Sequence, residues 1–273
     1  MSDEITIRRA ATGADYRACQ EAQRRAWGIA EDAYVVPVAT MVGAQLHGGL
    51  VLGAFGPDGQ AVGVSFAFLG RIEGRICLYS QLTGIVPGYQ GRGIGHRLKR
   101  AQAEFARAEG IALIAWAFDP LQPGNAHFNL AVLGASAGRY VEDMYGPRTD
   151  ALNHGTPTDR LIAEWETTPR PRRAIAMDDA LGLPRLIEAT ARPDGRPAVE
   201  AIDAAGTAPR VLLEIPAKIH LLRTHEPSLA DAWQQAVRQA FTAAFAAGFK
   251  AVGFLRDESL GARRCYYLLH RED

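Results

Sequence analysis

The sequence predicts a protein of the α+β class, with a sheet flanked by helices and a smaller α/β lobe towards the C-terminus. Helical patterns near the N-terminus are followed by three strand-like segments. A strand then runs through a glycine-dense loop directly into a helix, and a strand, helix, strand, strand order ends both halves of the chain. The length of 273 residues suits one large domain or two small ones.

A short strand and two helices are expected first. Residues 5–7 begin an alternating stretch, and Thr12 can cap a helix that runs to about Trp27. A second helix should follow Pro37 and stop at residues 48–49, which are both glycine. Its apolar face would consist of Val38, Met41, Val42 and Leu46.

Three strands should come next, at residues 50–55, 61–69 and 75–86. The first two are separated by a Gly-Pro-Asp-Gly turn at residues 56–59, so we expect an antiparallel hairpin there. The helix after the glycine-dense loop should place four apolar residues on one face, and Gly110 should end it. These four residues are Leu98, Ala101, Phe105 and Ala108.

The rest of the chain shows a similar alternation of elements. The expected elements are a strand at 111–118, a helix at 125–133, strands at 139–144, 161–165 and 211–215, a helix that begins with a capping box from Ser228 to Asp231, and a closing hairpin of residues 252–255 and 266–269. Residues 167–173 have the composition of a linker. We therefore predict two domains, residues 1–168 and residues 169–273.

Composition narrows the classes of function. Thirty basic and thirty acidic residues give a formal net charge of zero, so the overall charge of the protein does not favour binding to nucleic acid or to an anionic membrane. The three cysteines are far apart, and no histidine shows metal-ligand spacing, so we expect no disulfide framework and no metal site. The sequence has no apolar run of about 18 residues and no signal-peptide pattern, which predicts a cytoplasmic protein with reduced thiols.

The chemistry of the sequence concentrates at residues 82–95, where a strand feeds a glycine-dense loop and the loop feeds a helix. Glycines let the backbone approach a ligand, and the free amides at a helix start suit a pyrophosphate. Arg92, Arg97 and Arg100 could add positive charge. The pattern therefore predicts a phosphate-bearing cofactor; the alternative is a tight turn that binds nothing.

Spacing discriminates among phosphate-binding loops. A Walker loop requires a lysine and a Ser or Thr after its last glycine, and none follows here. A dinucleotide fingerprint requires Gly-x-Gly-x-x-Gly, whereas Gly91, Gly93 and Gly95 form Gly-x-Gly-x-Gly. Neither of these two readings fits the loop.

Residues 90–95 do resemble the Gln/Arg-x-x-Gly-x-Gly/Ala loop of GNAT (GCN5-related) N-acyltransferases, and the order of elements over residues 5–166 is similar too. The resemblance implies a central mixed, mostly antiparallel sheet and acetyl-CoA or another acyl-CoA as co-substrate. It also implies that the strands before and after the loop and its helix splay apart around the pantetheine arm. The cofactor-binding residues it implies are Ile85, Val86, Gln90, Gly91, Arg92, Gly93, Ile94, Gly95, Asn125 and Phe128.

Three further segments resemble a bacterial branch of predicted GNAT acetyltransferases with a C-terminal extension. They are residues 125–135, 144–146 and 153–160. The resemblance implies transfer of an acetyl or succinyl group to the amine of a small molecule or amino acid.

The acid and base of such a reaction are less evident. The strand before the loop carries Tyr79 and Ser80, either of which could relay a proton or be an ordinary strand residue. The family's usual tyrosine falls here near Leu130, so Tyr140 or Tyr145 would have to replace it, and Tyr145 is the preferred candidate. A pre-positioned amine could also attack with catalysis mainly by proximity.

The stretch 153–160 is a candidate substrate loop. Asn153 and Arg160 could bind a carboxylate-bearing substrate, with Arg160 as the fork-shaped donor; alternatively Asp159 and Arg160 form a turn that pins the loop to the body of the protein. A protein that binds CoA as a sensor or partner module without catalysis is the alternative function. A homodimer formed through the C-terminal lobe is compatible with both functions.

Overall fold

The computed structural model describes residues 5–146, 156–168, 177–191, 197–202, 208–258 and 263–271. The chain forms two compact units that interleave along the sequence. The first comprises Met1–Trp116, Tyr145–Pro157 and Glu166–Pro169, and the second comprises Ala117–Met144, Thr158–Trp165 and Arg170–Asp273. The domain boundary predicted after residue 168 stays a prediction, since residues 169–176 lie outside the described ranges.

The first unit is built on strands β1 to β5, which are neighbours in chain order. They are β1 (Thr6–Arg9), β2 (Leu50–Phe55), β3 (Ala61–Ile72), β4 (Arg75–Ile85) and β5 (Leu113–Phe118). Consecutive strands pair antiparallel from β1 to β4, whereas β4 and β5 run parallel. The predicted mixed α/β class with a mostly antiparallel sheet is confirmed, as is the hairpin of β2 and β3.

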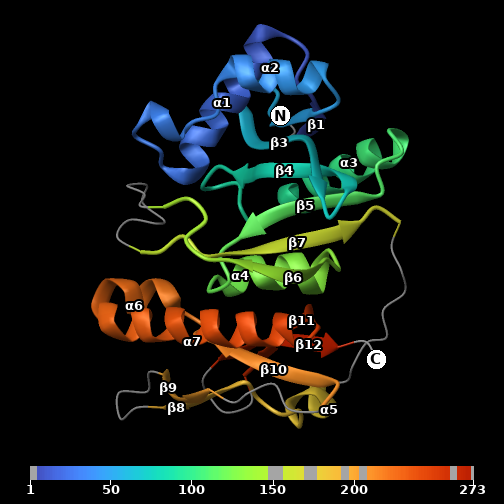
Figure 1. Ribbon diagram of the computed structural model, residues 1–273. Helices are drawn as coiled ribbons and strands as arrows, with labels where there is room; N and C mark the ends of the chain where they lie inside the picture. The colour runs from blue at the N-terminus through green and yellow to red at the C-terminus, as the bar shows by residue number, and fades with distance from the viewer. Residues whose placement is uncertain are drawn as a thin grey trace. The chain divides into compact units, whose positions relative to one another are not determined.

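Helices pack on both faces of these strands (Figure 1). On one face, α1 (Gly13–Trp27) and α2 (Val38–Leu46) enclose an apolar core with β2 and β3, and the 3₁₀ turn η1 (Asp32–Tyr34) lies between the two helices in sequence. The opposite face receives α3 (Ile94–Ala108), whose Gln102 bonds to Ser65 of β3. Helix α1 begins at the predicted cap, where Thr12 and Asp15 form a reciprocal capping box.

The second unit has its own antiparallel strand set, in the order β7-β6-β11-β12-β10. These strands are β6 (Ser136–Val141), β7 (Arg160–Glu166), β10 (Arg210–Ile215), β11 (Phe249–Asp257) and β12 (Arg264–Arg271). Strand β6 meets β11 at the pair Ala137–Ala251. The C-terminal residues therefore extend the sheet of β6 and β7, and the predicted closing hairpin is present as β11 and β12.

The helix α7 (Pro227–Ala246) supplies much of the core of this unit. It buries Trp233, Val237 and Phe241, as its helical spacing predicts. The other elements of the unit are α4 (Pro123–Ala126), the π-helical η2 (His127–Val132), α5 (Met177–Leu181), α6 (Ile219–His225), and the antiparallel pair β8 (Ile187–Ala191) and β9 (Pro197–Ile202).

Two expected helix features are wrong. Leu46 does not belong to a buried face of α2, because it lies at the last residue of the helix and is 74% exposed. The capping box from Ser228 is absent: α7 begins at Pro227, and its N-cap residue Glu226 makes no side-chain cap. Proline at the first helical position has a preset φ and needs no partner for an N–H, which explains the earlier start.

The buried face of α3 also differs from the predicted one. Leu98 is buried as expected, but Phe105 is only partly buried and Ala108 is exposed. Lys99 and Gln102 are buried in their place. Apolar periodicity does not reveal such a face, because polar side chains form part of it. Hydrogen bonds between these side chains offset the cost of burying them. Of the helices that the structure describes, none has both the length and the apolar composition needed to cross a bilayer.

Candidate functional site

Strand β4 changes its pairing halfway along. A β-bulge leaves Gln81 outside the register with β3, and such bulges are frequent next to active sites. On its other side, β4 pairs with β5 at two positions within the fully described range 75–118, and Tyr79–Ala115 is the last of them. Strand β4 nevertheless continues to Ile85. The two strands therefore part after Tyr79, and the rest of β4 faces a gap in the ladder.

The loop between β4 and α3 presents backbone amides at a helix start. Gly91 and Gly93 both have φ of +75°, a conformation that L-residues other than glycine rarely adopt. An added Cβ at either glycine would meet no atom within 4 Å, so backbone conformation and not crowding requires glycine there. Gly93 is the N-cap of α3 and makes no side-chain cap. The first N–H groups of the helix can therefore donate hydrogen bonds to an anion.

The predicted backbone ligands at the end of β4 are partly engaged within the protein. The Val86 amide donates to the Val62 carbonyl at 3.0 Å, and the Val86 carbonyl accepts from the Tyr89 amide at 3.0 Å. The Ile85 carbonyl accepts from the Gln90 side chain at 3.1 Å. Gln90 thus ties the start of the loop to the end of β4, which holds the glycines in place.

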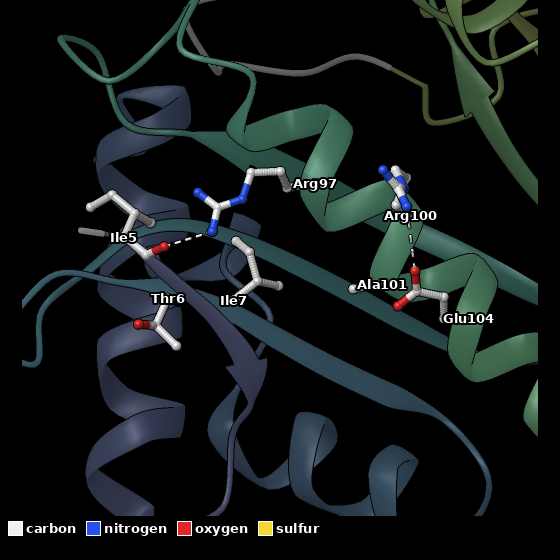
Figure 2. Close-up of a pocket in the computed structure, with 7 residues that line it drawn as sticks. All are labelled: Ile5, Thr6, Ile7, Arg97, Arg100, Ala101 and Glu104. Carbon is white, nitrogen blue, oxygen red and sulfur yellow. Dashed lines mark hydrogen bonds and ion pairs between the residues drawn. The ribbon is translucent and has the colours of Figure 1, made fainter. Parts of the chain in front are cut away.

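The three arginines expected near the loop separate in the structure. Arg92 remains in the loop, with its guanidinium over an aromatic ring. Arg97 and Arg100 line a hollow of about 430 Å³ together with residues of β1. Figure 2 shows how these lining side chains lie. There Arg97 donates to the Ile5 carbonyl at 2.7 Å, and Arg100 lies 3.9 Å from the Glu104 carboxylate. Only Arg92 of the three is therefore positioned within the glycine loop.

A buried amine lies beside the point where β4 and β5 part. Lys99 of α3 is 3% exposed, and its Nζ donates to Ser80 Oγ at 2.9 Å and to Gln102 Oε1 at 3.1 Å. The same nitrogen lies 3.9 Å from the centroid of the Trp116 ring on β5. Burial lowers the pKa of Lys99 to about 7.

From this amine, further hydrogen bonds extend across the face of the sheet that packs against α3. Gln102 Nε2 donates to both Ser80 Oγ and Ser65 Oγ, each at 3.1 Å, and Ser65 Oγ lies 3.0 Å from Thr83 Oγ1. We call Lys99, Gln102, Ser80, Ser65 and Thr83 the α3 polar cluster. No motif or apolar periodicity in the sequence points to its α3 and β3 members. One signal was available: Lys99 is one of only three lysines in an arginine-rich chain.

The predicted catalytic tyrosines lie in different settings. Tyr79 is half-buried on the face of β4 away from α3, with its ring 5.4 Å from that of Phe68. It belongs to the last residue pair before β4 and β5 part. Tyr145 lies in the turn after β6 and is 39% exposed. Leu130, where the family's tyrosine was expected, is buried. The catalytic roles of Tyr79 and Tyr145 stay predictions.

The segment after β5 belongs to the second unit and starts its helix two residues before the predicted Asn125. Asn125 is exposed and Phe128 is half-buried. Residues 127–132 are π-helical, a form that often marks functional positions. The half-buried His127 has an Nδ1 atom without a hydrogen-bond partner among the described residues, and burial, followed by the charge of Arg256, lowers its pKa. The cofactor roles of Asn125 and Phe128 stay predictions.

Asp159 anchors the end of the candidate substrate loop. Its buried carboxylate accepts from Tyr140 Oη at 2.5 Å and from Nε and Nη2 of Arg238, each at 2.9 Å. Burial and the bond to Asp159 raise the pKa of Tyr140 far above its usual range, so Tyr140 is a poor proton donor. Arg160 donates to the Asp159 carbonyl at 2.8 Å. Asn153 lies outside the described residues, and substrate binding by both residues stays a prediction.

Solved structures similar to this chain include acetyltransferases. A GNAT superfamily phosphinothricin acetyltransferase from Sinorhizobium meliloti, solved with acetyl-CoA, is 19% identical, with a TM-score of 0.48 over 64% of this chain and 96% of that protein. The ribosomal-protein-S18-alanine N-acetyltransferase from Escherichia coli is 17% identical, with a TM-score of 0.46 over 63% and 100%. An IAA acetyltransferase from Bacillus cereus is 16% identical, with a TM-score of 0.45 over 60% and 99%.

No protein-family model and no curated protein matches the sequence. The three structural likenesses are remote, with TM-scores of 0.45 to 0.48. Across the described ranges, no group of three or more His, Cys, Asp or Glu side chains is arranged to hold a metal ion.

Proposed function

We propose that this protein is an acyl-CoA N-acyltransferase of the GNAT type. The observation that carries the proposal is the combination of β4 and β5 parting after Tyr79 with a glycine loop that opens directly into the uncapped start of α3. An anion at that helix start would meet free N–H groups and the positive end of the helix dipole. A pantetheine arm is a thin chain of amide groups, and unpaired strand edges suit such a chain because they offer alternating donors and acceptors.

Different residues would bind the pyrophosphate and the pantetheine arm of acyl-CoA. Gly91, Arg92, Gly93, Ile94 and Gly95 would hold the pyrophosphate. The end of β4 would face the arm, with Gln90 holding the loop against Ile85. In the second unit, Asn125 and Phe128 are further proposed contacts.

The reaction is transfer of an acetyl or succinyl group to the amine of a small molecule or amino acid. The neutral amine attacks the thioester carbonyl carbon, the C–N bond forms as the C–S bond breaks, and the amine proton passes by way of a base or water to the leaving thiolate. Tyr145 is the proposed proton donor to sulfur and Tyr79 a proposed relay. Asn153 and Arg160 are the proposed contacts to a carboxylate on the substrate.

A CoA-binding module without catalysis is the second candidate. It is favoured by the loss of two proton donors: Leu130 replaces the expected tyrosine, and Tyr140 is committed to Asp159. Catalysis by proximity alone would still permit slow transfer. Release of free thiol from acetyl-CoA or succinyl-CoA in the presence of an amino-acid panel distinguishes an enzyme from a module that only binds.

Calorimetry with CoA tests the loop. Gly93→Glu puts a negative charge at the helix start, and we expect affinity for CoA to fall at least about tenfold. Gly59→Glu is the matched control, since Gly59 also has a positive φ of +78° with open space around it but lies in the turn between β2 and β3. Equal affinity in Gly93→Glu and Gly59→Glu, or no binding by the unmodified protein, would refute the proposal.

A further inference from the structure

We infer that Lys99 is a positioning residue of the proposed acyl-transfer site, fixing the separation of β4 and β5 where the two strands part. The inference rests on the proposed function. The last pair between these strands is Tyr79–Ala115, so Ser80 and Trp116 are the first residues beyond it. Lys99 Nζ contacts both, at 2.9 Å from Ser80 Oγ and 3.9 Å from the centroid of the Trp116 ring. One helical side chain therefore spans the base of the gap.

The contacts of this amine leave it little freedom to move. The Lys99 amine has three N–H donors when protonated and two when neutral, and hydrogen bonds to Ser80 and Gln102 use two donors in either form. The face of the Trp116 ring meets the same nitrogen from the β5 side. Because Lys99 is committed on three sides and buried, it would act on a bound thioester through the two strands and not by touching it.

Burying a lysine here is costly, which points to a role other than stability. The bonding partners Ser80 and Gln102 are neutral, so no opposite charge among them offsets the desolvation of the ammonium group. An apolar side chain of similar length would fill the same space at lower cost. A hydrogen bond and a cation–π contact, however, impose set distances on both strands, whereas apolar surfaces can slide past each other.

Helix α3 connects the contacts of Lys99 with Ser80 and Trp116, which we call the Lys99 brace, to the proposed cofactor loop. Lys99 lies in the second turn of α3, and the first turn begins at the glycine loop. Gln102, one turn further, bonds to Ser80 of β4 and Ser65 of β3. The α3 polar cluster thus fixes the helix start relative to the strand edges. The binding site for an acyl-CoA that reaches from the loop into the gap would therefore be preorganised. Preorganisation lowers the entropic cost of aligning the thioester.

The test compares two ligands that share the phosphates but differ in the arm. Calorimetry gives dissociation constants of CoA and of 3′-phospho-ADP, which lacks pantetheine, for the unmodified protein, Lys99→Met and Lys218→Met. Lys218 is exposed and serves as the matched control. We expect Lys99→Met to bind CoA about tenfold more weakly, a change of about 1.4 kcal/mol, and to bind 3′-phospho-ADP unchanged. Lys218→Met should bind both ligands normally.

Two outcomes overturn the inference: equal weakening for both ligands, which indicates a general structural defect, or unchanged CoA binding. Ser80→Ala removes one hydroxyl from the same brace and should weaken CoA in the same direction, so the test survives if Lys99→Met does not fold. The unmodified protein reports separately on the proposed function. If it does not bind CoA, the proposed function fails and this inference fails with it; if it binds CoA and the variants match it, only this inference fails.

Discussion

Replacement of Lys99 by methionine should change how the stability of the protein depends on pH. Burial lowers the pKa of Lys99 from 10.5 to about 7. Between these two values the unfolded chain binds a proton that the folded protein does not, so the free energy of unfolding rises with pH. At about 1.4 kcal/mol per pKa unit, the full difference amounts to roughly 5 kcal/mol.

The assay is urea denaturation followed by circular dichroism at pH 7, 8 and 9. For each pH unit above 7, the free energy of unfolding of the unmodified protein should rise by up to about 1.4 kcal/mol relative to that of Lys99→Met. Below pH 7 the difference between the two proteins should be constant, because Lys99 is then protonated in both the folded and the unfolded state. Lys218→Met, which alters an exposed lysine, should run parallel to the unmodified protein. A constant difference between the unmodified protein and Lys99→Met across pH 7–9 would refute the reasoning, since the buried amine would then keep its usual pKa.

Two further changes test the anchors of the fold. Arg238→Met should destabilise the protein by about 2–3 kcal/mol at neutral pH, because it leaves the buried Asp159 carboxylate with fewer donors. Burial raises the pKa of Asp159, but the bonds from Arg238 and Tyr140 outweigh it and lower the pKa overall. The deficit should therefore shrink as pH falls through the folded-state pKa; a deficit that does not change with pH would contradict this. Thr12→Ala removes one bond of the capping box and should cost about 1 kcal/mol in thermal unfolding, and an unchanged Tm would show that the cap is dispensable.

Local patterns in the sequence determined most elements of the first unit. Alternation and turn chemistry located β2, β3 and β4, and the run of glycines located the start of α3. Such features depend on residues close together in the chain: a positive φ needs glycine at Gly93 whatever packs around it. The same locality explains why an anion site could be predicted at this loop before any strand order was known.

Tertiary structure alone decided what lies beneath that loop. A lysine is normally placed at the surface by its charge, and only the approach of Ser80 and Trp116 from two different strands makes Lys99 a buried residue. Likewise, Arg97 turns towards the start of β1 because the backbone carbonyl of Ile5, the residue just before that strand, is available. Strand β6 joins β11 across more than a hundred residues, a pairing that no local pattern encodes. The sequence by itself therefore determined the glycine conformations of the loop and the helix that follows it, from which phosphate binding is predicted, while contacts between distant segments decided which side chains lie beside that helix.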